Sequence, residues 1–131
     1  MTPLLEHPTL HDIHQARERL KPHIRHTPLL RAEKMEATLG CELYLKPETL
    51  QITGAFKIRG ALNKALSLPR AAIANGIIAT SSGNHAQGLA YAARMLGVKA
   101  LLVVPVTTPK IKVENTRALG AEVILFDGDT A

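Results

Sequence analysis

The sequence is poor in the residues on which several classes of protein depend. Its 131 residues include one cysteine, Cys41, no tryptophan and only 3% aromatic residues. A single cysteine cannot form an internal disulfide or a cysteine zinc cluster, which favours a reducing, cytosolic setting. Few aromatic side chains leave little surface on which nucleic-acid bases could stack. These absences argue against a disulfide-rich secreted protein and a nucleic-acid-binding protein.

Long apolar runs and blocks of like charge are also missing. No stretch approaches the ~18 apolar residues that a membrane span needs, and the first residues lack the basic and apolar regions of a signal peptide. The net charge is +5, but the lysines and arginines are scattered, as on a solvated surface. We therefore expect a soluble, cytoplasmic protein without a membrane or nucleic-acid partner.

The first half of the chain predicts two helices and a strand. Thr9 and Asp12 form a capping-box pattern ahead of apolar residues at helical spacing, and Pro22 ends that pattern. Gly40 marks the end of a second, shorter pattern. We expect, in order, a helix over roughly 10–20, a helix over 33–39 and a strand over 41–46.

The second half alternates between amphipathic helices and continuous apolar strands. A helix begins near Lys57 and ends before Pro69, and Thr108 and Pro109 are the expected N-cap and first residue of the last helix. After the Lys57 helix we expect strand 77–81, helix 84–96, strand 99–104, helix 109–119 and strand 122–126. Such strands are typical of burial on both faces, which predicts an α/β fold with a doubly wound parallel sheet and right-handed crossovers.

Polar residues and glycine occupy positions 81–88 (Ser-Ser-Gly-Asn-His-Ala-Gln-Gly), between a predicted strand and a predicted helix. The first amides of a helix have no intrahelical partner and readily bind a carboxylate or phosphate. Serine and asparagine are also ordinary N-caps, so an anion-binding turn and a plain cap both stay open. In a parallel sheet this turn would lie at the carboxyl end of a strand, where ligands usually bind.

Lys57 stands at the start of its predicted helix, between Gly54 and Gly60. A lone lysine is in most cases a solvated surface residue. The N-terminal end of a helix, however, is the positive end of the helix dipole and disfavours a cation. At that end of a helix, an unprotonated or covalently bound lysine avoids the electrostatic cost of a positive charge, and such a lysine is suited to a Schiff base.

Together, positions 54–61 (Gly-Ala-Phe-Lys-Ile-Arg-Gly-Ala) and 81–88 closely resemble the threonine dehydratase and serine racemase group of pyridoxal-phosphate-dependent enzymes, which have the tryptophan-synthase-β-like fold. Ala55 departs from the serine that the family more often has, and we expect this difference to matter little. The resemblance covers nearly the whole chain, through 27–29 (Thr-Pro-Leu), 45–48 (Leu-Lys-Pro-Glu) and 119–123 (Leu-Gly-Ala-Glu-Val).

The resemblance implies roles for individual residues. Lys57 would bind pyridoxal 5'-phosphate as a Schiff base, Phe56 would pack beside the cofactor, and Asn84 would hydrogen-bond its 3′-oxygen. Ser82 matches the position where serine racemases keep a second acid/base, so Lys57 and Ser82 are the implied catalytic residues. No metal is implied. The substrate carboxylate would be held by helix N-terminal amides with Ser81, Asn84 and His85.

The implied activity is that of a lyase of amino-acid metabolism. An L-threonine or L-serine ammonia-lyase (dehydratase) would use Lys57 to remove the Cα proton, lose the β-hydroxyl and release a 2-oxo acid and ammonia. Threonine is the first expected substrate and serine the second. Racemisation of serine is the alternative reaction, and a non-catalytic βα binding module is the alternative of another class.

Two parts of the family pattern are absent from these 131 residues: a glycine-rich phosphate loop and a small polar residue for the pyridine nitrogen. The resemblance divides the chain into 1–47, the N-terminal part of the large domain, and 48–131, an incomplete small domain. We therefore expect a truncated chain that is inactive or nearly so alone, and that self-associates or is a piece of a longer, homo-oligomeric enzyme.

Three histidines provide a rival hypothesis. His7, His11 and His14 follow a helical spacing that could place three imidazoles on one face as metal ligands. Pro8 places the helix start after His7, however, and no carboxylate partner is obvious. Metal binding is therefore the less favoured alternative.

Overall fold

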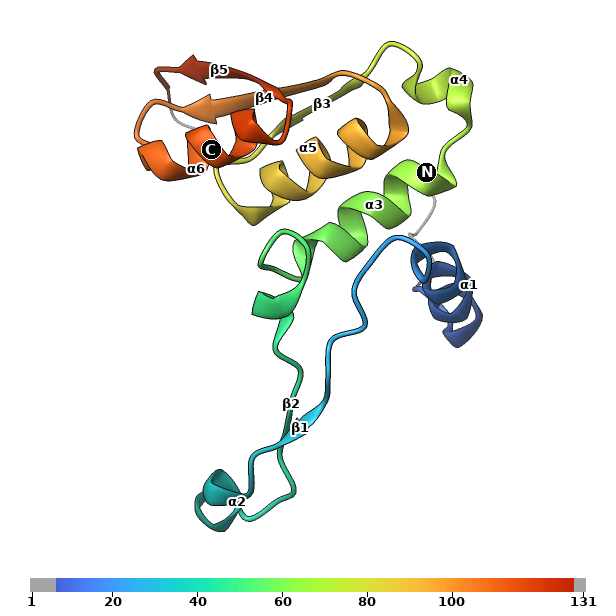
Figure 1. Ribbon diagram of the computed structural model, residues 1–131, viewed down its shortest axis with the longest axis vertical. Coiled ribbons are helices and arrows are strands. Elements are labelled where there is room, and N and C mark those ends of the chain that lie inside the picture. The colour runs from blue at the N-terminus through green and yellow to red at the C-terminus, as the bar shows by residue number, and fades with distance from the viewer. Residues whose placement is uncertain (1–6, 129–131) are drawn as a thin grey trace, which may run out of the picture.

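A three-stranded parallel sheet lies at one end of the molecule, in the computed structural model that describes residues 7–128 (Figure 1). The strand order is β3-β4-β5. Leu102 of β4 pairs with Ala79 on one side and Val123 on the other. The strands are β3 (Ile77–Thr80), β4 (Ala100–Pro105) and β5 (Glu122–Phe126).

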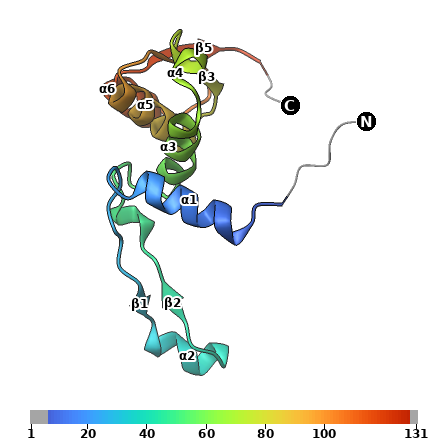
Figure 2. The same cartoon turned by 90° about the vertical axis from the view of Figure 1, so that its right-hand side faces the viewer.

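Helices cover one face of this sheet. Helices α5 (Asn84–Leu96) and α6 (Lys110–Ala118) lie on the same side of the strands (Figures 1 and 2). On that side Leu102 is fully buried, whereas Ile78 on the other side is 70% exposed. The expectation that the strands are buried on both faces is therefore wrong for residues 7–128, because no helix among them packs on the second face. The α/β class with a parallel sheet is confirmed.

Helix α3 (Lys57–Ser67) forms a further layer by packing against α5 on the side away from the sheet (Figure 1). A cluster of apolar residues joins the two helices, and Gly88 of α5 faces the first turn of α3. A Cβ at Gly88 would lie 3.2 Å from the Cβ of Ala61 and 3.4 Å from the Cα of Ile58. The missing side chain therefore allows α5 to approach α3 closely. The cluster consists of Leu20, Ile58, Leu62, Ala65 and Ala92.

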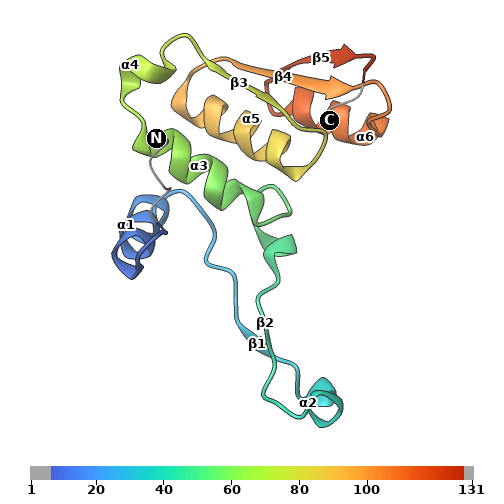
Figure 3. The ribbon, with the colours of Figure 1, turned by 180° about the vertical axis from the view of Figure 1, so that it is seen from behind.

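The N-terminal residues form a helix and a projecting arm. Helix α1 (Leu10–Leu20) has the expected capping box, in which Thr9 and Asp12 hydrogen-bond each other's backbone amide. Its last residue, Leu20, is buried against α3 and α5. The arm points away from the sheet (Figures 1 and 3). It contains β1 (Leu30–Arg31), α2 (Glu33–Leu39) and β2 (Tyr44–Leu45), with β1 and β2 antiparallel.

Two predicted details were wrong. The strand expected over 41–46 is confined to Tyr44–Leu45, because its partner β1 offers only two residues for pairing. Thr108 is not the N-cap of α6: Pro109 occupies that position with an extended ψ of 130°, and its carbonyl accepts the amide of Lys112. Because Thr108 lies one residue too early to cap, its hydroxyl oxygen is buried without a hydrogen-bond partner among the described residues.

The other predicted elements were confirmed to within one or two residues, and Gly40 and Gly97 end α2 and α5 in the left-handed conformation. Two short elements were not predicted: η1 (Glu48–Leu50) and α4 (Arg70–Ile73). Within residues 7–128, no helix has the combination of length and apolar character that crossing a bilayer requires.

Candidate active site

Lys57 begins helix α3 with an exposed side chain. Its Nζ lies 4.9 Å from the centroid of the Phe56 ring, a distance at which a cation contacts the ring face favourably. Phe56 holds the N-cap position, where its side chain provides no hydrogen bond to the helix amides. No carboxylate of residues 7–128 forms an ion pair with Lys57. The amine is therefore accessible, and the neighbouring Phe56 is itself 58% exposed.

The turn between β3 and α5 leaves the first amides of α5 without a side-chain cap. Gly83 is the N-cap, in an extended conformation, and Asn84 is the first helical residue. The Ser81 hydroxyl accepts a weak hydrogen bond from the Gly83 amide at 3.4 Å, outside the helix. Neither serine nor asparagine therefore serves as the N-cap. Of the two interpretations left open by the sequence, the plain serine or asparagine cap is wrong, and the anion-binding turn stays a prediction.

Close packing of α3 on α5 brings the two motifs together. Gly88 lies one helical turn after Asn84, and a Cβ there would be 3.4 Å from the backbone nitrogen of Ile58, which directly follows Lys57. The starts of the two helices are thus neighbours, although Lys57 and Asn84 are far apart in sequence. Phe56 and Asn84 line one open groove of about 530 Å³, whose other walls are residues 45–49 and 54–55.

The serines line a separate, adjacent depression. Ser81 and Ser82 contribute to a shallow polar cleft of about 330 Å³ at the carboxyl ends of β3 and β4, with Thr80, Val103 and Pro105. His85 is exposed on the first turn of α5. The structure therefore places Phe56 and Asn84 in one groove and Ser81 and Ser82 in the next, and the individual roles of all six candidate residues stay predictions.

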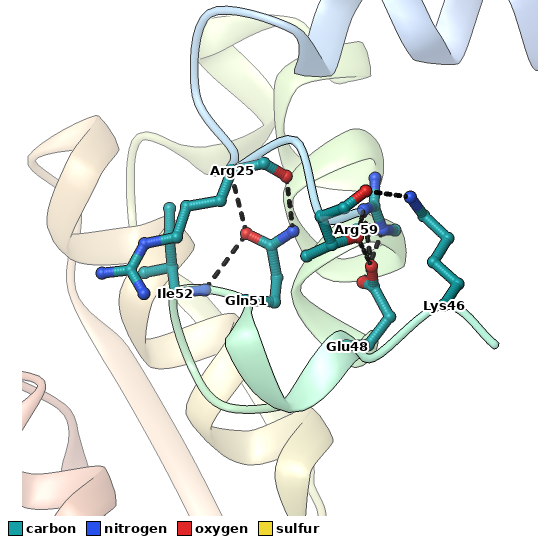
Figure 4. Close-up of polar contacts among 7 residues, drawn as sticks. Arg25, Lys46, Glu48, Gln51, Ile52 and Arg59 are labelled. Atoms are coloured by element: carbon teal, nitrogen blue, oxygen red, sulfur yellow. Dashed lines mark hydrogen bonds and ion pairs between the residues drawn. The ribbon is translucent and has the colours of Figure 1, made fainter. Parts of the chain in front are cut away.

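A partly buried set of polar contacts next to the first turn of α3, which we call the clasp, was missed by the sequence analysis (Figure 4). The carboxylate of Glu48 accepts two hydrogen bonds from the Arg59 guanidinium, at 2.6 and 2.7 Å, and one from the Thr27 hydroxyl at 2.5 Å. The Lys46 amine donates to the Thr27 carbonyl at 2.8 Å. Thr27 is 2% exposed, and the Glu48 side chain is 15% exposed. The hydrogen bonds from Arg59 hold the pKa of Glu48 down at about 2.

Gln51 forms the second half of this clasp. Its amide oxygen accepts from the backbone N–H of Arg25 at 2.9 Å, and its amide nitrogen donates to the Arg25 carbonyl at 2.8 Å (Figure 4). Gln51 is 2% exposed. Two signals in the sequence pointed to these residues: the polar residues lie close to the Lys57 motif, and Thr27, Lys46 and Glu48 fall in the stretches 27–29 and 45–48 that carry the family resemblance. Nothing in their spacing indicated that they pair with the segment 25–27.

The histidine hypothesis finds no structural support. Residues 7–128 contain no group of three or more histidine, cysteine or acidic side chains that could hold a metal ion. His11 instead lies with its Nε2 2.9 Å from the side-chain amide nitrogen of Gln15.

The residues at the groove suit a cofactor that carries an aldehyde and an aromatic ring. An accessible primary amine, an exposed aromatic face and an asparagine amide surround or adjoin a groove within the size range of cofactor sites. Uncapped helix amides nearby suit a carboxylate.

Comparison with known proteins identifies relatives over most of the chain. A family model described as "Pyridoxal-phosphate dependent enzyme" matches residues 20–131. L-threonine ammonia-lyase of Geobacter sulfurreducens is 50% identical over 113 residues, which cover 86% of this chain and 28% of that enzyme. Serine racemase of Arabidopsis thaliana is 46% identical over 112 residues, which cover 86% of this chain and 34% of that enzyme.

A solved structure of a related enzyme is also similar to this chain. Serine racemase from Dictyostelium discoideum matches with a TM-score of 0.86 and 40% sequence identity, over 93% of this chain and 40% of that one. In all three comparisons the chain spans well under half the length of its relative.

Proposed function

The chain belongs to the pyridoxal-phosphate-dependent enzyme family, and on that premise we propose that it supplies part of the active site of an L-threonine or L-serine ammonia-lyase. The reaction would release a 2-oxo acid and ammonia. The observation that carries this proposal is the packing of α3 on α5, which makes neighbours of the helix starts that bear Lys57 and Asn84. The 50% identity to an L-threonine ammonia-lyase supports the choice of reaction.

Three residues would hold the cofactor. Lys57 would bond through Nζ to its aldehyde carbon, the Phe56 ring would pack beside it, and the Asn84 amide would donate to its 3′-oxygen. When bound, the cofactor draws electrons from the substrate Cα and so acidifies the Cα proton.

The remaining roles concern the amino-acid substrate. The uncapped amides of α5, with the side chains of Ser81, Asn84 and His85, would bind its carboxylate. The Lys57 amine, freed from the cofactor, would accept the Cα proton as a general base. Ser82 would serve as an acid/base on the opposite face if the reaction were racemisation.

Under the same proposal, residues 1–47 belong to a large domain and residues 48–131 to a small one. The candidate groove has walls from both sides of this boundary, with residues 45–47 on one side and residues 48–49, 54–56 and Asn84 on the other. We further propose that the complete enzyme acts in the cytoplasm as a homo-oligomer.

The test uses the complete gene product. With pyridoxal phosphate and L-threonine it should form 2-oxobutanoate and show the visible absorbance of a lysine-bound cofactor. Lys57→Ala should abolish both signals. Lys64→Ala, which changes an exposed lysine of the same helix, should leave both intact. A visible band that survives Lys57→Ala would exclude the role given to this lysine.

A second reaction is supported by the similarity to serine racemases. Incubation with L-serine separates the two reactions. A racemase leaves D-serine, which chiral analysis of the recovered serine detects, whereas a lyase converts the serine to pyruvate. A cofactor band without either product would favour the non-catalytic binding module.

A further inference from the structure

The loop that precedes Lys57 is tied to the rest of the molecule mainly by the clasp, with Ala55 as the one buried apolar residue between Gln51 and Lys57. Residues 52–54 are not buried, and Phe56 is 58% exposed. Glu48 and Gln51, in contrast, reach from this loop to the segment 25–27 with several short hydrogen bonds (Figure 4). The placement of the loop therefore depends on these polar contacts.

Arg59 connects the clasp to the helix that bears Lys57. Arg59 lies two residues after Lys57, and residues at this spacing face different sides of a helix. Its guanidinium donates two parallel hydrogen bonds to the Glu48 carboxylate. This bidentate geometry fixes the orientation of the Arg59 side chain as well as its distance from Glu48. On another side, Ile58 and Ala61 rest against Gly88 of α5. The first turn of α3 is thus held on two sides, which fixes its rotation about the helix axis.

We propose that Glu48 is a positioning residue for Lys57: by binding Arg59 and Thr27, it sets the rotation of the first turn of α3 and thereby the position of the lysine amine beside the Phe56 ring, which lines the groove. This inference rests on the proposed function of Lys57. Glu48 itself need not touch substrate or cofactor. A small rotation of the turn is sufficient to misplace the amine, and a misplacement of about 1 Å can cost roughly 100-fold in a reaction that depends on geometry.

The arm offers a matched control. Glu36 accepts two hydrogen bonds from Arg31, at 2.9 and 2.8 Å, and a third from the Leu43 amide. Its side chain is 17% exposed, compared with 15% for Glu48. The two glutamates are therefore alike in partner, hydrogen-bond number and exposure, but only Glu48 is joined to the Lys57 helix.

The experiment compares Glu48→Gln and Glu36→Gln in the complete gene product. The readouts are the affinity for pyridoxal phosphate, from the visible absorbance of the lysine-bound cofactor, and the acylation rate of Lys57 relative to Lys64 in cofactor-free protein, from mass spectrometry. We expect Glu48→Gln to weaken cofactor affinity by at least about tenfold and to change the acylation ratio. Glu36→Gln should change affinity less than about twofold, even where both variants lose the same thermal stability.

A milder pair covers the case in which Glu48→Gln does not fold. Thr27→Val removes one hydrogen bond to Glu48, whereas Thr27→Ser keeps the hydroxyl. Thr27→Val should weaken cofactor affinity severalfold, whereas Thr27→Ser should keep it close to that of the wild type. If the wild-type protein binds cofactor through Lys57 and all these variants match it, the positioning role is overturned while the proposed function stands. If the wild-type protein forms no Lys57-dependent absorbance band, both the positioning role of Glu48 and the proposed function are overturned.

Discussion

Glu48 carries its charge in a site where that charge is hydrogen-bonded on several sides. The Arg59 guanidinium lowers the pKa of Glu48 most, burial opposes this, and the Thr27 hydroxyl and the nearby charges of Arg59 and Lys46 lower it further, to about 2 against an ordinary 4.5. A carboxyl whose pKa is lower in the folded state stabilises that state above its unfolded pKa. This contribution is lost as the pH falls from about 4.5 towards 2.

We therefore predict an acid-sensitive contribution to stability from this one residue. At pH 7, Glu48→Gln should reduce the free energy of unfolding by about 1–2 kcal/mol, a value that allows for solvent around the ion pair. Between pH 4.5 and 2 the difference from the wild type should shrink, because glutamine does not titrate. Urea unfolding curves at several pH values measure this. A difference that stays constant with pH would show that the ionised form is not what stabilises the fold.

Gly88 shows how one residue sets the distance between two elements. It lies in the middle of α5, where glycine costs up to about 1 kcal/mol relative to alanine. That cost is offset by the close approach of α3, which buries Ile58 and Leu62 completely. Glycine is therefore favoured at position 88 by the contact between α5 and α3, and not by helix propensity.

Gly88→Ala should consequently destabilise the protein despite its better helix propensity. The new methyl group would meet the Cβ of Ala61 at 3.2 Å and the backbone of Ile58 at 3.4 Å, and overpacking of this kind costs about 1–3 kcal/mol. Gly60→Ala is the control, because a Cβ at that exposed position of α3 meets no atom within 4 Å. Chemical denaturation should show a net loss for Gly88→Ala and a neutral or stabilising effect for Gly60→Ala. Equal changes in the free energy of unfolding for the two variants would mean that α3 can move away from α5 without a loss of stability.

The elements differ in how far the sequence determines them. Helices α1 and α5 follow from apolar spacing and from local signals such as the Thr9 and Asp12 capping box and Gly97. Local patterns of this kind require no knowledge of the fold. The pairing of Glu48 with Arg59 and Thr27 could not be predicted, because it arises only when α3 folds against the segment that precedes the arm. The N-cap of α6 was missed because Pro109 adopts the extended conformation of a cap instead of the helical one.

At the scale of the whole molecule, exposed apolar side chains lie on the open face of the sheet, on the arm and on α1, where Leu10 and Ile13 are 68% and 59% exposed. The uncovered face of the sheet carries Ile78 and Ile124, at 70% and 45% exposure, and the register places Leu101 and Val103 on that same face. The arm exposes further apolar side chains, including Leu30, Met35 and Tyr44. Contiguous apolar surface of this kind promotes association.

We predict that the 131-residue chain, prepared alone, self-associates at micromolar concentration through the open face of the sheet. Ile78→Thr should shift sedimentation velocity profiles towards the monomer, because threonine suits a strand and reduces the apolar surface. Ile111→Thr is the control: Ile111 is 61% exposed on α6, away from that face, and its replacement should leave the profiles unchanged. Association that resists Ile78→Thr would point to the arm or to α1 instead.

The layering of α3 on α5 also has a consequence for synthesis on the ribosome. Ile58 and Leu62 are covered by α5 residues such as Ala92, which lies 34 positions after Ile58. At a translation rate of about 5–20 residues per second, the apolar side of the lysine helix waits roughly two to seven seconds for its cover to be made. During that interval Leu20 of α1, already synthesised, is the member of the same cluster that can shield it. Helix α1 can thus act as a temporary cover for the nascent chain before it becomes one side of the finished core.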